Sequence, residues 1–240
     1  MANFKTHIVV GATVSGVLSS TLLSTNYIDS TDAFMLFTLG SLGSILPDID
    51  SKTSVPFKVS VSLITVFVSF FVIFSKQHYS LLEMGILWLL SFYTLRYLFM
   101  EVFIKFTAHR GIFHSIPMGF LLGVITTLML DRFFWIEPKF SVWGGFFVTV
   151  GFLTHLILDE VYSVDLMNKR LKKSFGTAFT LYKKNNLFGT VVVYFLLFIL
   201  FQSISNYTVV TEVIVSKSLY VEIWENLFPR DGWFSDFIRL

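Results

Sequence analysis

The sequence predicts an all-α, polytopic transmembrane helical bundle with about seven spans and a short C-terminal appendage. Hydrophobic residues make up 54% of the 240 residues and charged residues only 14%, whereas soluble chains average roughly 45–50% and ~25%. Phenylalanine alone contributes 29 residues, and the mean hydropathy is +0.71. A soluble domain of this size has no core large enough to bury so much apolar surface. Disordered chains are polar and poor in aromatic residues, so disorder is excluded as well.

Seven apolar segments approach the roughly 17–25 residues that a spanning helix needs. The first is rich in small residues, which favours close helix packing inside the bundle, and this dilution argues against a cleaved signal peptide. The second is short and ends at Pro47, whereas the fourth is so long that it must tilt or protrude. We expect the spans at 8–27, 32–46, 57–75, 80–106, 116–135, 140–162 and 188–204.

The chain divides where the last predicted span ends. We expect residues 1–204 to form a transmembrane domain of catalytic type. Residues 205–240 alternate apolar and polar side chains and then become aromatic with mixed charge. This pattern predicts a C-terminal tail that is interfacial or forms a small extramembrane segment.

Lysine and arginine residues indicate the orientation, because short cytoplasmic loops are enriched in both. Their strongest concentration lies in 165–184, which we therefore place in the cytoplasm. Counting spans from this loop puts the N-terminus and the loops 47–56 and 105–115 on the same side. We therefore expect a multi-pass membrane protein with a cytoplasmic N-terminus and a tail on the outer side.

The charge and cysteine counts exclude several functions. The net charge is +2, from 18 Lys and Arg against 16 Asp and Glu, so the chain lacks the basic excess of a nucleic-acid-binding protein. The chain has no cysteine, which excludes disulfides, thiolate metal sites and cysteine nucleophiles. It also has no Gly-x-Ser-x-Gly motif, which counts against a serine lipase.

Histidine and aspartate residues gather at the ends of the predicted spans. They open the first span, follow the second, lie between the fourth and fifth, and close the sixth. All fall on the predicted cytoplasmic side. This agreement is independent evidence, because the spans were placed by hydropathy and oriented by Lys and Arg, without the His and Asp residues. Ionisable groups at bilayer depth are functional candidates by default. The predicted metal ligands are His7, Asp48, Asp50, His109, His114, His155 and Asp159.

The spacing of these residues suits metal coordination. His155 and Asp159 are four residues apart and share a helix face, and the close carboxylates of Asp48 and Asp50 repel unless a cation or proton lies between them. A single His or Asp at a helix end is more often a cap or an interfacial group. The mixed set favours Zn²⁺, with Mn or Fe as alternatives, over Mg²⁺ or Ca²⁺. Seven donors exceed the needs of one tetrahedral ion, which leaves room for two or more ions.

Two further residues are candidates for catalysis. Arg110 lies between two predicted ligands, and a guanidinium binds phosphate in a bidentate manner. Glu160 is a candidate proton acceptor. Together these residues predict a metal-dependent hydrolase that cleaves a phosphate ester of a lipid or lipid-linked substrate at the cytoplasmic face. A metal-ion transporter and a non-catalytic metal-binding membrane protein remain alternatives.

Four motifs occur in order along the chain: Thr6-His7, Leu46-Pro47-Asp48-Ile49-Asp50-Ser51, His109-Arg110-Gly111-x-x-His114-Ser115 and His155-Leu156-Ile157-Leu158-Asp159. This order resembles the YdjM-like family of bacterial inner-membrane proteins, which are described as metal-dependent hydrolases. The resemblance covers about residues 1–165. It implies a polytopic helical fold in the inner membrane, and it assigns the metal site to the same seven residues. The chain departs from the family after Asp159, where it reads Glu160-Val161-Tyr162 instead of continuing to a nearby Thr and Gly.

Overall fold

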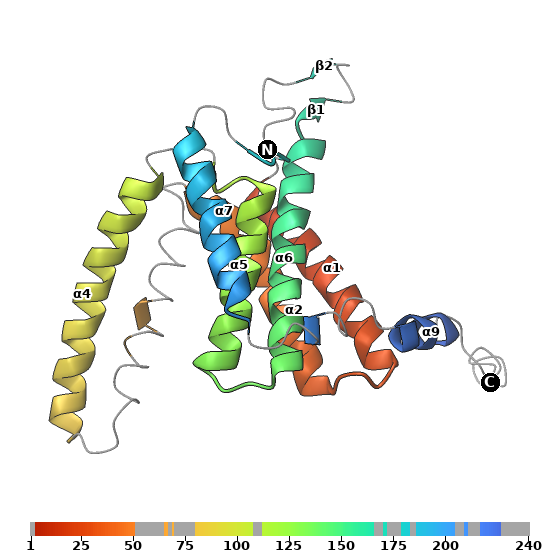
Figure 1. Cartoon of the computed structure of the whole chain (residues 1–240), viewed down its shortest axis with the longest axis horizontal. Coiled ribbons are helices and arrows are strands. Elements are labelled where there is room, and N and C mark those ends of the chain that lie inside the picture. Colours follow the sequence, from red (N-terminus) through yellow and green to blue (C-terminus); the bar gives the residue numbers. More distant parts are fainter. Residues whose placement is uncertain are drawn as a thin grey trace. The chain divides into compact units, whose positions relative to one another are not determined.

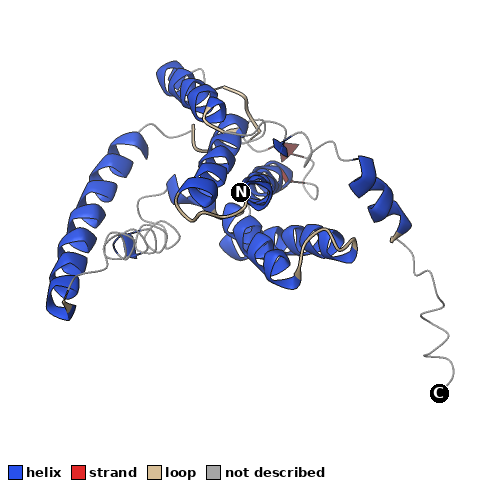
Figure 2. Cartoon of the chain, turned by 60° about the horizontal axis from the view of Figure 1, so that its bottom comes forward, coloured by secondary structure: helices blue, strands red, loops and turns tan. Residues whose placement is uncertain are grey.

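The computed structural model describes residues 3–50, 65–66, 69, 80–107, 112–165, 170–171, 179–182, 186–204, 209–210 and 217–226. Helices form nearly all the regular structure of these residues (Figure 2). The chain forms two compact units. The first contains Met1–Ile45 and His114–Leu240, and the second contains Leu46–Phe113.

The first unit is a helical bundle with α6 at its centre. Helix α6 packs against α1, α2 and α5, while α7 packs against α5 (Figure 1). The start of α1 and the end of α6 lie at the same end of the bundle (Figure 1). The described helices of this unit are α1 (Phe4–Ser24), α2 (Ser30–Gly43), α5 (Ile116–Arg132), α6 (Pro138–Val161), α7 (Leu187–Gln202) and α9 (Lys217–Glu225).

The second unit contains a short 3₁₀ helix, η1 (Leu46–Asp50), and a long helix, α4 (Leu81–Thr107). The N-terminus of α4 is capped by Ser80 and Glu83. The backbone N–H of Ser80 donates to Glu83 Oε2 at 2.8 Å, which satisfies a donor that the helix itself leaves free. At ~1.5 Å per residue, α4 is about 40 Å long.

The predicted helical fold is confirmed, and six of the seven predicted segments contain a described helix. The third segment, 57–75, lies outside the described residues except for 65–66 and 69. Among the described residues, α1 and α6 are long and apolar enough to cross a membrane, and Leu82–Thr94 and Leu187–Gln202 are shorter apolar helices. The number of spans therefore stays a prediction, as does the domain boundary at residue 204.

Polar caps move two helix boundaries away from those that hydropathy predicts. Helix α1 begins at Phe4 because the Asn3 side chain accepts a hydrogen bond from the Thr6 N–H at 2.8 Å. Asp29 caps α2 in the same way through the Asp32 N–H. The early start of α1 places His7 within the first turn of a regular helix.

One strand pair was not predicted. Strand β1 (Val164–Asp165) pairs antiparallel with β2 (Arg170–Leu171) directly after α6. Each strand has only two residues, too few to produce the alternating pattern by which strands are recognised in a sequence.

Small residues bring α1, α2 and α6 into backbone contact. A Cβ at Gly151 of α6 would overlap the carbonyl oxygen of Gly40 on α2, and a Cβ at Gly40 would overlap the side chain of Ser15 on α1. Close approach through Gly and Ser is typical of helices packed within membranes. Gly11, Ser15 and Ser19 of the first segment are buried inside the bundle, as the sequence predicted, whereas Ser20 is exposed.

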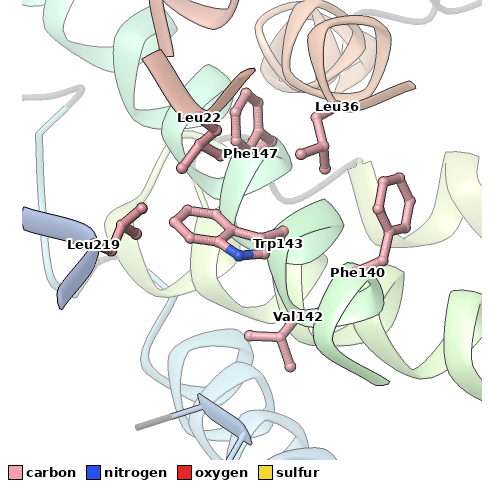
Figure 3. Close-up of a cluster of buried hydrophobic side chains, with 7 residues drawn as sticks. All are labelled: Leu22, Leu36, Phe140, Val142, Trp143, Phe147 and Leu219. Atoms are coloured by element: carbon pink, nitrogen blue, oxygen red, sulfur yellow. The ribbon is translucent and has the colours of Figure 1, made fainter. Parts of the chain in front are cut away.

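A hydrophobic cluster fills the other end of this unit. Trp143 lies at its centre, between Leu22 of α1 and Leu219 of α9 (Figure 3). Helix α9 is thus packed on the bundle, although it belongs to the predicted tail. The cluster consists of Leu22, Leu36, Phe140, Val142, Trp143, Phe147 and Leu219.

The contact between α2 and α6 predicts that Gly151→Ala destabilises the protein by about 1–3 kcal/mol, because the added methyl group forces two backbones apart. Gly85→Ala on α4 is the control, since a Cβ there meets no atom within 4 Å. That change should be neutral or stabilise the helix by up to about 1 kcal/mol. The measurement is the midpoint of thermal unfolding in detergent. An unchanged midpoint for Gly151→Ala would contradict the close α2–α6 contact.

Candidate metal centre

Four of the seven predicted ligands come together at one end of the first unit. His7 lies in the first turn of α1, and Asp159 lies in the last turn of α6 with His155 one turn before it. His114 immediately precedes Ser115, the N-cap residue of α5. All four are buried, with at most 8% of the residue surface exposed. We call these four residues the imidazole–carboxylate cluster.

Local structure fixes the position of each ligand. The buried face of α1 repeats every fourth residue through His7, Gly11 and Ser15, so His7 faces α2 and α6. Helix α5 has a proline in its first turn, which sets the backbone direction directly after His114. The N–H of Ile116 also donates to the carbonyl oxygen of Thr180 at 3.0 Å.

One carboxylate faces three imidazoles. Asp159 Oδ1 lies 3.3 Å from His7 Nε2. Asp159 Oδ2 lies 3.6 Å from His155 Nε2 and 3.8 Å from His114 Nε2. Ligands about 2.0–2.1 Å from a tetrahedral zinc ion lie about 3.3–3.4 Å from one another. The nitrogen–oxygen separations of the cluster are thus close to those around such an ion.

The imidazole rings also contact one another. The rings of His7 and His155 stack with their centroids 3.6 Å apart and 13° between their planes. The His114 ring meets His155 edge-on, with centroids 5.7 Å apart. Ligand atoms of His7, His155 and Asp159 all lie within 4.8 Å of one another. The donor atoms of His7, His155 and Asp159 therefore lie close together.

The carbonyl oxygen of Ser44 determines the tautomer of His155. It lies 2.7 Å from His155 Nδ1, and because a carbonyl can only accept, Nδ1 carries the hydrogen. In the neutral ring the lone pair then lies on Nε2, which faces Asp159 Oδ2. Two acceptors at that separation require a cation or a proton between them. Metal-bound histidines commonly donate their second ring N–H to a carbonyl in this way.

The chemistry of the donors indicates which ion the cluster suits. His7 directs Nε2 at Asp159, whereas its Nδ1 is buried without a hydrogen-bond partner among the described residues and does not face the carboxylate. Three imidazoles and one carboxylate fit zinc or another transition metal better than Mg²⁺ or Ca²⁺.

The other predicted site residues remain predictions. Asp48 and Asp50 lie on η1 of the second unit, and the Asp50 side chain is outside the described part of the structure. His109 and Arg110 lie outside the described residues. Glu160 follows Asp159 on α6 and is half-buried, about 100° further around the helix.

Sequence reasoning missed Ser44. This residue contributes a backbone carbonyl, which every residue type possesses, so its identity carries no signal. Only the packing contact indicates its role, because Gly11 of α1 leaves the space that the Ser44 side chain occupies. A contact of this kind between distant helices is not apparent from spacing along the chain.

The geometry predicts that His155→Ala and Asp159→Ala each lower zinc affinity by more than about tenfold. The double variant should lose little more, because ligands of one ion act as a unit. Thr154→Ala is the matched control, because Thr154 is adjacent to His155 and its hydroxyl donates to the Val150 carbonyl of its own helix. We would measure bound metal per mole of purified protein after zinc addition. Stoichiometric zinc in both single variants would place the site elsewhere.

Comparison with known proteins identifies the family. A family model described as YdjM inner membrane protein matches residues 1–225, which extends past the last of the four motifs into α9. Searches of the curated proteins and of the solved structures gave no match. The family and the two helices apolar enough to span a bilayer make this a membrane protein. The match covers most of the chain, and the chain therefore belongs to the YdjM inner membrane protein family.

Proposed function

We propose that this chain is a metal-dependent hydrolase, and that His7, His114, His155 and Asp159 hold its ion. The observation that carries the proposal is the hydrogen bond from His155 to the Ser44 carbonyl oxygen, at 2.7 Å. It presents the Nε2 lone pair of His155 to the Asp159 carboxylate, an arrangement that suits a divalent cation. Zinc fits the donor set best, with manganese or iron next. A bound ion would generate hydroxide near neutral pH and polarise a phosphoryl oxygen.

The chain's own residues have separate tasks in this proposal. Ser44 and the stacked His7 ring hold the His155 ring in one orientation, and the burial of the cluster excludes bulk water. Glu160, half-buried beside the cluster on α6, accepts the proton from the attacking water. Arg110 binds the substrate phosphate. Asp48, Asp50 and His109 stay predicted ligands, and the full set of seven donors leaves room for a second ion.

The position of the cluster along its helices supports a lipid phosphate as substrate. His7 lies in the first turn of α1 and Asp159 in the last turn of α6, and both helices are long enough to cross a membrane. Helix ends lie near the headgroup level, where the phosphates of lipids are found. Transporters commonly bind their ions near the bilayer midplane instead. This position favours hydrolysis over the alternative of metal transport.

The proposal predicts that the zinc-loaded protein releases phosphate or a phosphorylated headgroup from phospholipids or polyprenyl phosphates in mixed micelles. A chelator should abolish the release, zinc should restore it, and Asp159→Ala should remove it. Arg110→Lys should retain zinc but lose most of the turnover, because an ammonium group cannot bind phosphate in a bidentate manner. Thr154→Ala should behave like the wild type.

Two results would contradict the hydrolase. One is bound zinc with no hydrolysis of any lipid phosphate. The other is zinc flux into sealed proteoliposomes that depends on Asp159, which would establish the transporter instead. If Arg110→Lys loses zinc, Arg110 supports the loop and does not bind substrate.

The proposal includes the topology: about seven spans in the inner membrane, with the N-terminus and 165–184 in the cytoplasm. The basic residues of 165–184 support this orientation. Alkaline phosphatase is active only outside the cytoplasm, so a fusion after residue 205 should be active and a fusion after residue 168 inactive. Activity in the reverse order would overturn the orientation, and inactivity of both fusions would require an even number of spans.

A further inference from the structure

Helix α9 packs at the end of α1 that is remote from the imidazole–carboxylate cluster. Its Leu219 is buried in the hydrophobic cluster with Leu22 of α1 and Trp143 of α6 (Figure 3). Leu22 lies about 22 Å from His7 along α1, at 1.5 Å per residue, and hydrocarbon is ~30 Å thick. Because α1 is long and apolar enough to cross a membrane, α9 lies near the depth at which the hydrocarbon ends.

The axis of α9 runs across the bundle and not along it. Helix α6 stands upright in Figure 1, whereas α9 lies across the view. Figure 2 looks more nearly along α6, and α9, the helix beside the C-terminal label, extends sideways there too. With nine residues, α9 is about 14 Å long and too short to cross a membrane. A helix of this length and direction at the end of a spanning helix suits the membrane surface.

Two faces of α9 meet different surroundings. Leu219 and Ile223 are one turn apart and line the cavity that α9 forms with α1 and α6, so this face contacts the bundle. Ser218, Glu222 and Glu225 are all exposed and fall on another side of the helix, because each residue is rotated by about 100° from the one before. We call these three residues the polar face.

The third face of α9 is apolar and exposed. Tyr220, Val221 and Trp224 are 57%, 47% and 74% exposed, and we call them the aromatic face. Tryptophan and tyrosine are enriched where a membrane meets water, because their rings are apolar but carry a polar atom. Lys217 begins the helix on the same side, and lysine can keep its methylenes in hydrocarbon while its ammonium group reaches the headgroups.

The spacing of the three faces matches three different media. At about 100° per residue, their centres lie about 120° apart around the helix axis. Protein covers the face of Leu219 and Ile223, and the charged polar face suits water. An isolated helix this short is marginal in water, and only one of its faces packs on the bundle. Lipid is the medium that would bury the aromatic face.

We propose that α9 is an in-plane interfacial helix whose aromatic face binds the phospholipid surface on the side of the membrane opposite the imidazole–carboxylate cluster. Helices of this kind bury their apolar face about 5–10 Å into the boundary between headgroups and acyl chains. The sequence predicted a tail that is interfacial or extramembrane, and this inference assigns α9 to the first alternative. It does not depend on the proposed hydrolase activity, because it requires neither a metal nor a substrate.

The test measures the surroundings of each face with nitroxide spin labels. The chain has no cysteine, so one introduced cysteine carries one label. Tyr220→Cys and Trp224→Cys label the aromatic face, and Ser218→Cys and Glu222→Cys are the matched controls on the polar face. The labelled full-length protein is reconstituted in vesicles of phosphatidylethanolamine and phosphatidylglycerol. Electron paramagnetic resonance then measures collisions of each label with oxygen, which concentrates in hydrocarbon, and with a water-soluble nickel chelate.

The ratio of oxygen to nickel collisions should be several times higher for the two aromatic-face labels than for the two controls. The depth calculated from this ratio should be about 5–10 Å below the lipid phosphates. Equal access of the nickel chelate to all four labels would overturn the inference, because α9 would then lie in water. Exclusion of both reagents from the Tyr220→Cys and Trp224→Cys labels would overturn it as well, because protein and not lipid would then cover the aromatic face.

Discussion

The close packing of α1, α2 and α6 is the constraint on which the rest of the site depends. Gly151 brings the backbones of α6 and α2 together, and Gly11 makes room on α1 for the Ser44 side chain. Only this approach allows the Ser44 carbonyl oxygen to reach His155 Nδ1 at 2.7 Å. A larger residue at either glycine would separate the helices that carry the ligands. The small residues therefore position the imidazole–carboxylate cluster, although none of them belongs to it.

The burial of the cluster makes an ion or a shared proton necessary. A carboxylate removed from water is costly unless it is paired, and at the end of a membrane helix few partners are available. Asp159 meets this requirement through three imidazoles from α1, α6 and the start of α5. Because Ser44 fixes the tautomer of His155, the lone pair on His155 Nε2 faces an oxygen of Asp159. A divalent cation between these two atoms would stabilise this arrangement.

The sequence predicted the parts of the site that depend on local spacing. The four-residue separation of His155 and Asp159 placed both on one face of a helix, and span counting placed His7 and His114 at the same end of the bundle. Hydropathy also located most of the helices. It did not locate the start of α1, because a cap such as Asn3 depends on one hydrogen bond and contributes little to an average.

Contacts between distant segments could not be predicted in the same way. The Ser44 carbonyl carries no residue-specific signal, and the stacking of His7 on His155 depends on the angle at which α1 and α6 cross. The packing of Leu219 against Trp143 joins the C-terminal region to the bundle across more than seventy residues. Such contacts are set by the shapes of whole helices, which a single sequence does not reveal.

Zinc K-edge X-ray absorption on the zinc-loaded wild-type protein tests the central claim most directly, because it reports the atoms bound to the ion. The account predicts a first shell of nitrogen and oxygen at about 2.0–2.2 Å with the multiple-scattering signature of several imidazoles, and a reduced imidazole contribution in His155→Ala. A shell of oxygen alone, or a spectrum that His155→Ala leaves unchanged, would show that the imidazole–carboxylate cluster does not hold the metal.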